Sequence, residues 1–288
     1  MNENKTNINW YPGHMAKTKR LISDNYNLID VVYELVDARI PYSSKIKDID
    51  TLVKNKPRIL VMTKTDLCDL KVTNNWKSYY EKKGYHVLML DLTNNKDYLK
   101  LVKLTNEIMS GLREKIESRG LTKKEIRALV VGVPNVGKST LINQFANKKV
   151  ANVGNTPGVT KQINWLKTPH NILLLDTPGI LWPKIDNEIV GLNLASFSAI
   201  KNEIIPEDKV AVYILNTLNR HYPDILKTRF KVDNISLDIE ETYEKIGRSL
   251  NFITRGNEVD YDKISNYILN DLKNNIKGIT FDRDDFNE

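Results

Sequence analysis

Cysteine is almost absent from the sequence, because Cys68 is the only one in 288 residues. A single cysteine excludes an internal disulfide and a cysteine-rich metal site, and it is typical of proteins in a reducing compartment. The simplest role for Cys68 is that of a small apolar residue in the core.

Long apolar runs are missing as well. No stretch approaches the about 20 apolar residues that span a bilayer, and residues 1–9 are polar, without the apolar core of a signal peptide. We therefore expect a cytoplasmic protein that has no membrane partner.

The composition is otherwise that of a globular protein. Hydrophobic residues make up 41% of the chain and charged residues 27%, and the length allows one α/β domain and a smaller second domain. Lysine and arginine (43) exceed aspartate and glutamate (36), which gives a net charge of +7. This excess favours a polyanionic partner.

The stretch from Gly132 to Ser139 has the pattern of a phosphate-binding loop. It follows an apolar run at 126–131 and precedes a helical pattern at 140–146. In such a loop, backbone N–H groups and the helix N-terminus bind phosphate, the lysine reaches the β- and γ-phosphates, and the serine hydroxyl binds Mg²⁺. We therefore predict a nucleotide site that uses Lys138 and Ser139 in these two roles; an incidental glycine-rich turn would not require a serine after the lysine.

Strands and helices alternate along the first two thirds of the chain, which predicts a parallel sheet with helical crossovers. The expected strands are 28–36, 58–62, 86–90, 126–131, 164–167 and 172–175. The expected helices here are 16–26, one from Pro41 to 54, 74–83, 97–117 and 140–146. Beyond Pro183 the pattern becomes helical, over 187–201, 207–220, 224–230, 239–250 and 262–274. The acidic residues at the C-terminus (Asp282, Asp284, Asp285 and Glu288) are expected to fray.

Asp176 to Gly179 follows the strand expected at 172–175. Nucleotide hydrolases hold Mg²⁺ with an aspartate at this place and contact the γ-phosphate through the glycine N–H. The aperiodic segment 150–161 carries Thr160 and Thr156. We expect Thr160, with Thr156 as the alternative, to complete the Mg²⁺ coordination, and the other threonine to cap a turn.

Residues 63–66, Thr-Lys-Thr-Asp, also follow a buried strand. A carboxylate can accept both of the adjacent donors of guanine, so Asp66 can read guanine but not adenine, and the stem of Lys64 would lie over the base. The alternative is a polar turn with Asp66 as a helix cap. The base-reading loop precedes the phosphate loop in the chain, an order that a circular permutation explains.

This order and three further motifs resemble the circularly permuted GTPases of ribosome assembly, and most closely the ribosome biogenesis GTPase A family. The motifs are Trp10-Tyr11-Pro12-Gly13-His14-Met15-Ala16-Lys17, Val36-Asp37-Ala38-Arg39-Ile40-Pro41 and Asp176-Thr177-Pro178-Gly179-Ile180-Leu181-Trp182-Pro183. The resemblance runs nearly end to end. Two departures are Thr63, where the family usually has asparagine, and Asp91-Leu92-Thr93 at the second base-contacting segment.

The resemblance implies a fold and a division of the chain. We expect an α/β fold with a circularly permuted P-loop GTPase domain at residues 1–184, including an N-terminal arm at 1–26. Residues 185–288 would form a small all-α domain that resembles an RNA-binding fold. Its basic residues that could meet phosphates, or simply be solvated, are Lys201, Lys209, Arg220, Lys227, Arg229 and Lys231.

The resemblance also bears on catalysis. Ile180 stands where Ras-like enzymes have the glutamine that orients the attacking water, and the family points instead to His14, whose imidazole can accept a proton near neutral pH. The alternatives for His14 are packing against Trp10 and contact with RNA phosphate. Asn135 resembles the loop asparagine that coordinates K⁺ in related GTPases. The other role open to it is bracing of the segment 150–161, which we expect to be a mobile loop.

These motifs give one set of expected site residues and one expected function. Catalytic roles are expected for His14 and Lys138, Mg²⁺ ligation for Ser139, Thr160 and Asp176, and K⁺ ligation for Asn135. The expected nucleotide-binding residues are Thr63, Lys64, Asp66, Asn135, Val136, Gly137, Lys138, Ser139, Thr140, Thr160 and Gly179.

We expect a monomeric GTPase that uses GTP, GDP and Mg²⁺ and acts late in maturation of the large (50S) ribosomal subunit. It would bind the precursor's rRNA and ribosomal proteins, be stimulated by the subunit, and leave after hydrolysis. The alternatives are a non-catalytic RNA-binding scaffold that uses nucleotide structurally and a GTPase of RNA modification or signalling.

Overall fold

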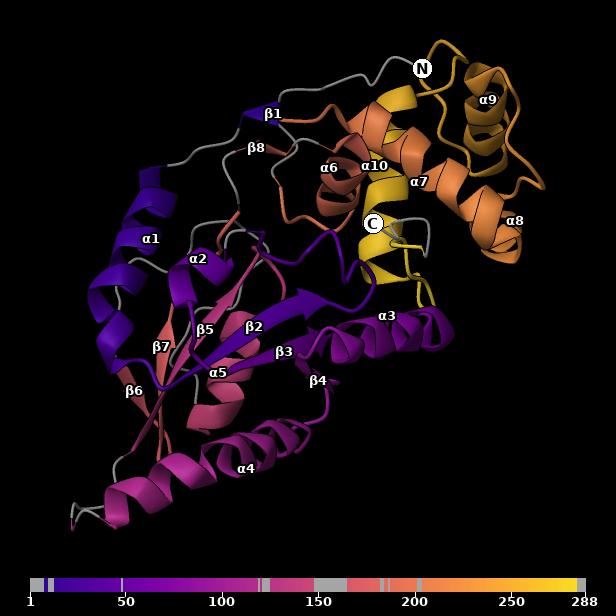
Figure 1. Ribbon diagram of the computed structural model, residues 1–288. Helices are drawn as coiled ribbons and strands as arrows, with labels where there is room; N and C mark the ends of the chain where they lie inside the picture. The colour runs from indigo at the N-terminus through magenta and orange to yellow at the C-terminus, as the bar shows by residue number, and fades with distance from the viewer. Residues whose placement is uncertain are drawn as a thin grey trace.

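A six-stranded sheet and two groups of helices make up the computed structural model (Figure 1). The structure describes residues 8–9, 13–47, 49–118, 120, 125–147, 165–181, 184–185, 187–200 and 204–283. Within these residues, no helix has the length and apolar character needed to cross a bilayer.

The sheet has the strand order β4-β3-β2-β5-β7-β6, and only β6 runs antiparallel to its neighbour. Its strands are β2 (Val31–Asp37), β3 (Arg58–Thr63), β4 (His86–Met89), β5 (Ile126–Gly132), β6 (Trp165–Lys167) and β7 (Ile172–Asp176). The central strands are rich in valine, leucine and isoleucine because both faces of the sheet are covered, as parallel sheets require. The expected α/β fold with a mainly parallel sheet is confirmed.

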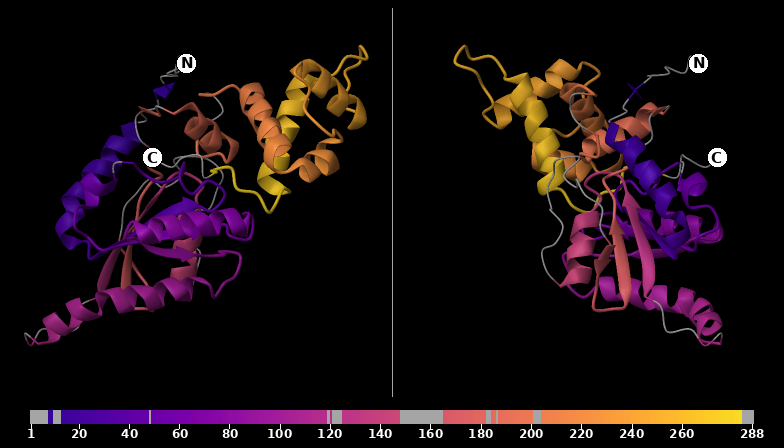
Figure 2. Two further views of the ribbon diagram at one scale, coloured as in Figure 1. Left: turned by 45° about the vertical axis from the view of Figure 1, so that its right-hand side comes forward. Right: turned by 90° about the vertical axis from the view of Figure 1, so that its left-hand side faces the viewer.

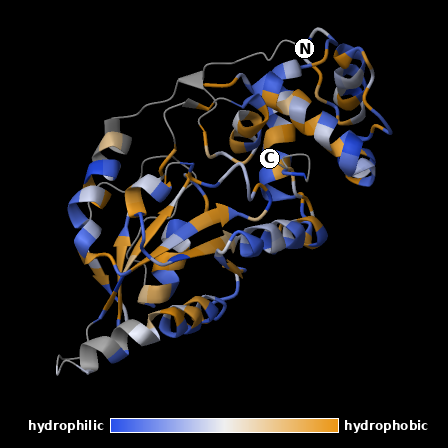
Figure 3. Ribbon diagram, viewed as in Figure 1, coloured by the Kyte–Doolittle hydropathy of each residue, from blue (hydrophilic) through white to orange (hydrophobic). Residues whose placement is uncertain are grey.

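Alternate residues of the strands face opposite helical layers. Tyr33 and Leu35 of β2 belong to a buried cluster with α4 (Tyr98–Glu117) and α5 (Lys138–Ala146). Val32 and Val36 belong to clusters with α1 (Gly13–Asn25), α2 (Ile49–Val53) and α3 (Leu70–Lys82) on the other face. The hydropathy colouring shows apolar strands between helices of mixed polarity (Figure 3).

The helix expected from Pro41 to 54 is much shorter in the structure. The chain forms turns through residues 38–45 and becomes helical only at Ile49. Local side-chain hydrogen bonds explain this, because Ser44 Oγ donates to the carbonyl of Ile40 and accepts from the N–H of Asp37. Serine side chains that satisfy the backbone in this way compete with helix formation.

The C-terminal region is helical, as expected, and its helices gather at one end of the molecule (orange to yellow in Figure 2). They are α6 (Glu188–Ser196), α7 (Glu207–His221), α8 (Pro223–Phe230), α9 (Ile239–Ser249) and α10 (Tyr261–Asn274). Asn187, Asp238 and Asp260 cap the N-termini of α6, α9 and α10 with side-chain hydrogen bonds, and Pro223 opens α8.

The helical region contacts the sheet domain at both of its ends. At its start, the two-residue strand β8 (Lys184–Ile185) pairs with β1 (Ile8–Asn9) of the N-terminal arm. At its end, residues 278–282, which we name the C-terminal strap, run back to the sheet domain, where the N–H groups of Gly278 and Ile279 donate to the carbonyl of Leu67.

Asp282, in the strap, is fully buried, so the expectation that it frays is wrong. One of its oxygens accepts from the N–H groups of Tyr42 and Ser43, and the other from Ser43 Oγ and Asn193 Nδ2. The remaining acidic residues of the tail (Asp284, Asp285 and Glu288) lie outside the described residues.

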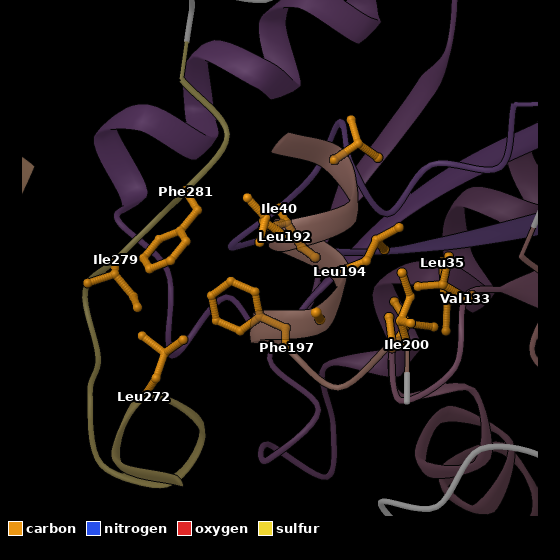
Figure 4. Packing of buried hydrophobic residues seen from close by; sticks show 14 of the residues in the cluster. Leu35, Ile40, Val133, Leu192, Leu194, Phe197, Ile200, Leu272, Ile279 and Phe281 are labelled. Carbon is orange, nitrogen blue, oxygen red and sulfur yellow. The ribbon is translucent and has the colours of Figure 1, made fainter. Parts of the chain in front are cut away.

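Apolar side chains fill the space between the strap, α6 and the strand ends (Figure 4). Phe281 packs edge to face on Phe197, with ring centroids 5.2 Å apart, and Ile200 lies near Leu35 and Val133. One hydrophobic cluster therefore continues from the sheet into the helical region.

Candidate nucleotide-binding site

The phosphate loop connects β5 to the N-terminus of α5, at the carboxyl end of the sheet. Gly137 has φ of +103°, a conformation that favours glycine, and directly precedes the helix. Lys138 Nζ donates to the carbonyls of Gly132 and Val133 at 3.0 and 2.8 Å. Burial lowers the pKa of Lys138 to about 8, against a smaller opposing effect of Asp176.

The base-reading loop packs directly against the phosphate loop. Thr63, at the end of β3, donates from Oγ1 to the carbonyl of Val136 at 2.6 Å and to that of Val36 at 3.1 Å. A Cβ on Gly137 would lie 3.1 Å from Leu92, and Gln144 of α5 donates to the carbonyl of Leu92 at 2.7 Å. Thr63, which stands where the family usually has asparagine, therefore links the base-reading loop to the phosphate loop through its hydroxyl. Leu92, in the second base-contacting segment, lies next to the phosphate loop and to α5.

The two residues expected to contact the base, Lys64 and Asp66, differ in exposure and in their partners. Asp66 is exposed, whereas Lys64 Nζ is held 2.9 Å from Asp37 Oδ2. Arg39 makes a two-pronged hydrogen bond to the same carboxylate, at 3.0 and 2.8 Å. Burial alone would raise the pKa of Asp37, but the charges of Arg39 and Lys64 outweigh it and hold the pKa well below its usual range.

The Asp176 to Gly179 segment lies beside the phosphate loop, since β7 pairs in parallel with β5 and Asp176 is opposite Val130. Thr177 Oγ1 donates to the carbonyl of Val130 at 2.8 Å. A Cβ on Gly179 would lie 2.8 Å from the backbone nitrogen of Pro134, so only glycine fits at this contact. The N–H group of Ile180 donates to the carbonyl of Gly132, and its side chain is buried in the cluster that contains Ile22 of α1.

A cavity of about 300 Å³ joins the two loops. Lys64 and Leu67 line it from the base-reading loop, and Asn135, Gly137, Lys138, Ser139 and Thr140 line it from the phosphate loop and α5. Asp66 is not among its lining residues, although both Lys64 and Leu67 are.

Four residues of this cavity come from the helical region and have no place in the sequence motifs. They are Phe197, Ser198, Lys273 and Asn274. Arg39 lines the cavity as well, from the motif at residues 36–41. Asn135 Nδ2 donates to the carbonyl of Ser198 at 2.6 Å, and the Arg39 guanidinium lies 4.2 Å from the centroid of the Phe197 ring. The helical region therefore forms one wall of the nucleotide cavity. The sequence signals for Arg39 were its place just after a buried strand and its membership of the motif at residues 36–41, although no role was predicted for it.

The cavity suits a polyanion. Its described lining residues include four basic side chains, Arg39, Lys64, Lys138 and Lys273, and no acidic one. Ser139 at the start of α5 and Asp176 at the end of β7 lie at the same edge of the sheet. A hydroxyl and a carboxylate are oxygen ligands of the kind that Mg²⁺ prefers, so these residues fit the expected ion.

Four residues with expected roles lie outside the described residues. They are Thr156, Thr160, Trp10 and Lys201, the last of which was expected to meet phosphates. His14 is described only through its backbone, in the first turn of α1. Of the other expected site residues, Lys64, Asn135, Gly137, Lys138, Ser139 and Thr140 line the cavity, whereas Thr63, Asp66, Val136, Asp176 and Gly179 do not.

Three features of the site define a circularly permuted GTPase. They are a phosphate loop at the start of a helix, an Asp-x-x-Gly segment at the end of the adjacent strand, and a base-reading loop earlier in the chain.

Two family models match the sequence, one described as 50S ribosome-binding GTPase over residues 127–251 and one described as RsgA GTPase over residues 49–185. Proteins named Ribosome biogenesis GTPase A from Priestia megaterium and Bacillus licheniformis are each 44% identical to the chain. The first alignment covers 98% of both sequences, and the second covers 92% of this chain and 94% of the relative.

The chain belongs to the ribosome biogenesis GTPase A family. It is a GTPase, and it binds guanine nucleotides. Among solved structures, GNP-bound YlqF from T. maritima matches with a TM-score of 0.63 at 24% identity, covering 93% of this chain and 98% of that one. This match agrees with the fold described above.

Proposed function

We propose that this GTPase acts late in assembly of the large ribosomal subunit. It binds the precursor in its GTP form, responds to correctly formed rRNA, and leaves after hydrolysis. Support comes from the name of its relatives, from the family model described as 50S ribosome-binding GTPase, and from a basic cavity walled by both the GTPase loops and the helical region. The cytoplasmic location and the monomeric state stay predictions.

We assign the site residues as follows. Lys138 and the loop N–H groups hold the β- and γ-phosphates, and the exposed Asp66, which lies between the lining residues Lys64 and Leu67 in the chain, reads guanine. Ser139 and Asp176, with Thr160, hold Mg²⁺, which when bound neutralises charge on the β- and γ-phosphates. The Gly179 N–H contacts the γ-phosphate, and Thr63 braces the phosphate loop through Val136. K⁺ ligation by Asn135 stays a prediction.

The water-orienting group is proposed to be His14. Ile180, the residue after the Asp-x-x-Gly motif, is 1% exposed and packed in an apolar cluster, so it cannot hydrogen-bond a water. His14 stands in the first turn of α1, whose Ile22 packs in the same cluster as Ile180. His14→Ala should reduce turnover and leave GTP affinity nearly intact, whereas equal loss of both would show that His14 is structural.

We divide the chain into a GTPase domain at residues 1–184 and a helical domain at 185–288, and we propose that the helical domain responds to the nucleotide. Lys273, near the end of α10, lines the cavity, and burial lowers its pKa against the opposing charge of Glu207. A nucleotide phosphate or ribose would therefore meet a cation from the helical domain. Removing one charge-assisted contact costs about 1.5–3 kcal/mol, so Lys273→Met should weaken nucleotide affinity about 10- to 150-fold. Lys277→Met, at an exposed lysine outside the cavity lining, is the matched control.

The decisive experiment is GTP turnover with and without purified large subunits, in K⁺ and in Na⁺ buffer. Stimulation by large subunits but not by small subunits is the expected result. No stimulation by either would contradict the proposal, and a requirement for K⁺ would support ligation by Asn135.

A further inference from the structure

A hollow lined mainly by tyrosine and lysine side chains of the GTPase domain lies near the end of α3, and Val190 of α6 also lines it. Its volume is about 190 Å³, and we name it the tyrosine–lysine groove. Its lining includes Tyr79, Tyr80, Tyr85, Lys45, Lys47 and Lys83. None of these residues lines the nucleotide cavity.

The groove continues into a second hollow, because Lys83 and Tyr85 line both. The second hollow, of about 340 Å³, adds Lys54, Lys56, Arg58 and His86 at the amino end of β3 and β4. Among the described residues that line either hollow, none is acidic. The combined surface therefore has the charge that attracts a phosphate backbone.

Nearby carboxylates neutralise only part of this charge. Buried Glu34 lies 3.8 Å from Lys45 Nζ and 3.4 Å from Arg58 Nη1, and Asp50 lies 2.5 Å from Arg58 Nη2. The ammonium groups of Lys83 and Lys56 lie instead over aromatic rings, 4.5 Å from the centroid of Tyr79 and 4.6 Å from that of Tyr26.

The tyrosine rings are fixed by one another. Tyr80 makes edge-to-face contacts with Tyr79 and Tyr85, with centroid distances of 5.2 and 5.8 Å, and Trp76 packs edge-on to Tyr79 at 5.4 Å. Tyr80 is buried and donates from its hydroxyl to the carbonyl of Pro41. Tyr79 is half-buried, so part of this rigid ring meets the solvent.

The face of the Tyr79 ring is covered by the Lys83 ammonium, but a nucleobase would bind this face more strongly than the lysine does. An exposed cation–π contact is worth about 0.5–1 kcal/mol, whereas stacking of a base on an aromatic side chain is worth about 1–3 kcal/mol. Lys83 is exposed and flexible, so it can move aside to a phosphate while a base lies on the ring.

We propose that the tyrosine–lysine groove binds unpaired RNA, with a base stacked on Tyr79 and phosphates held by Lys83 and its basic neighbours. Three of the basic residues that the sequence offered on the helical domain are paired with carboxylates instead. Lys227 pairs with Asp233, Arg229 with Asp271, and Lys209 with Glu188. The GTPase domain thus contributes an RNA-binding face of its own, which is selective for single strands because stacking needs an unpaired base.

Fluorescence anisotropy of the full chain with a labelled RNA of about 12 nucleotides tests the proposal. The single strand should bind more tightly than a duplex of the same sequence. Tyr79→Ala should weaken single-strand binding about 5- to 150-fold, and Tyr79→Phe should retain it because the ring remains. Lys83→Gln should lower the slope of log affinity against log salt by about 0.7.

Two matched variants on the helical domain control for general effects. Tyr261→Ala removes an exposed, stacked tyrosine and Lys245→Gln an exposed lysine, and neither should change RNA affinity. The proposal is overturned if no RNA binds, if duplex and single strand bind alike, or if Tyr79→Ala and Lys83→Gln behave as these controls do. Because Lys83 is exposed and outside the core, its variant stays informative even if Tyr79→Ala unfolds.

Discussion

Raising the pH from about 4 to about 7 is expected to destabilise the folded chain through Asp282. Burial raises the pKa of this carboxyl from its ordinary 3.8 to about 6, although hydrogen bonds from Ser43, Tyr42 and Asn193 oppose the shift. The folded state therefore holds the proton more tightly than the unfolded chain does. The resulting stabilisation is complete below about pH 4 and is lost as the pH rises through about 6.

The size of this effect follows from the shift itself. About two pKa units correspond to about 3 kcal/mol of unfolding free energy. In a marginally stable protein, this is a large fraction of the total free energy of unfolding. The loss should fall first on the C-terminal strap, because Asp282 holds the strap to Tyr42 and Ser43.

Urea unfolding of the wild type and of Asp282→Asn at a series of pH values measures the effect. The amide cannot titrate, so the variant should lack about 3 kcal/mol of the wild-type decline between about pH 4 and 7. Glu34, whose pKa is raised by burial, and Asp37, whose pKa is lowered, titrate in both proteins and cancel in the difference. Trp76 fluorescence reports on the strap directly, because its Nε1 donates to the Asp282 carbonyl.

Equal pH dependence in the two proteins would refute the reasoning. It would mean that the four donors around the carboxylate compensate fully for its burial. Asp262→Asn, which alters an exposed aspartate in the first turn of α10, is the control and should follow the wild type.

Two further substitutions test the contacts of the phosphate loop. Gly179→Ala places a Cβ 2.8 Å from the Pro134 nitrogen, and relieving this overlap costs about 1–3 kcal/mol. GTP affinity, measured by titration with a fluorescent nucleotide, should therefore fall about 5- to 150-fold. Unchanged affinity would show that the loop can move to relieve the overlap at no cost. Thr63→Val keeps the side-chain shape but leaves the Val36 and Val136 carbonyls without the Oγ1 donor. Urea unfolding should therefore show that the free energy of unfolding falls by about 1–3 kcal/mol. A variant as stable as the wild type would show that another donor replaces the hydroxyl.

The sequence predicted those parts of the site that depend on short stretches of chain. The phosphate loop, the base-reading loop and the Asp176 to Gly179 segment each need only a strand end and a few residues after it. Parallel strands bring their carboxyl ends to one edge of the sheet, so three local motifs converge without further information. The fold class followed from the same alternation of strands and helices.

The wall formed by the helical domain could not be predicted in this way. Asp282 meets Ser43 across 239 positions of sequence, and in a C-terminal stretch rich in aspartate it has the pattern of a solvated residue. Lys273 belongs to an amphipathic helix whose pattern gives no sign of a ligand at its end. Contacts of this range depend on how the domains pack, which no short motif encodes.

The attachment of the helical domain at both ends limits how it can move. Its first residues are fixed through the pairing of β8 with β1, and its last through the buried carboxylate of Asp282. Between these two ends, the Asn135–Ser198 hydrogen bond and the shared hydrophobic cluster also hold the helical domain to the sheet. If a change of nucleotide broke the contact between Asn135 and Ser198 while both ends held, the helical domain would be limited to a rotation that moves Ser198 and Lys273 past the phosphate loop. A ribosomal surface bound to the outer side of these helices would then sense the nucleotide state as a change in their tilt.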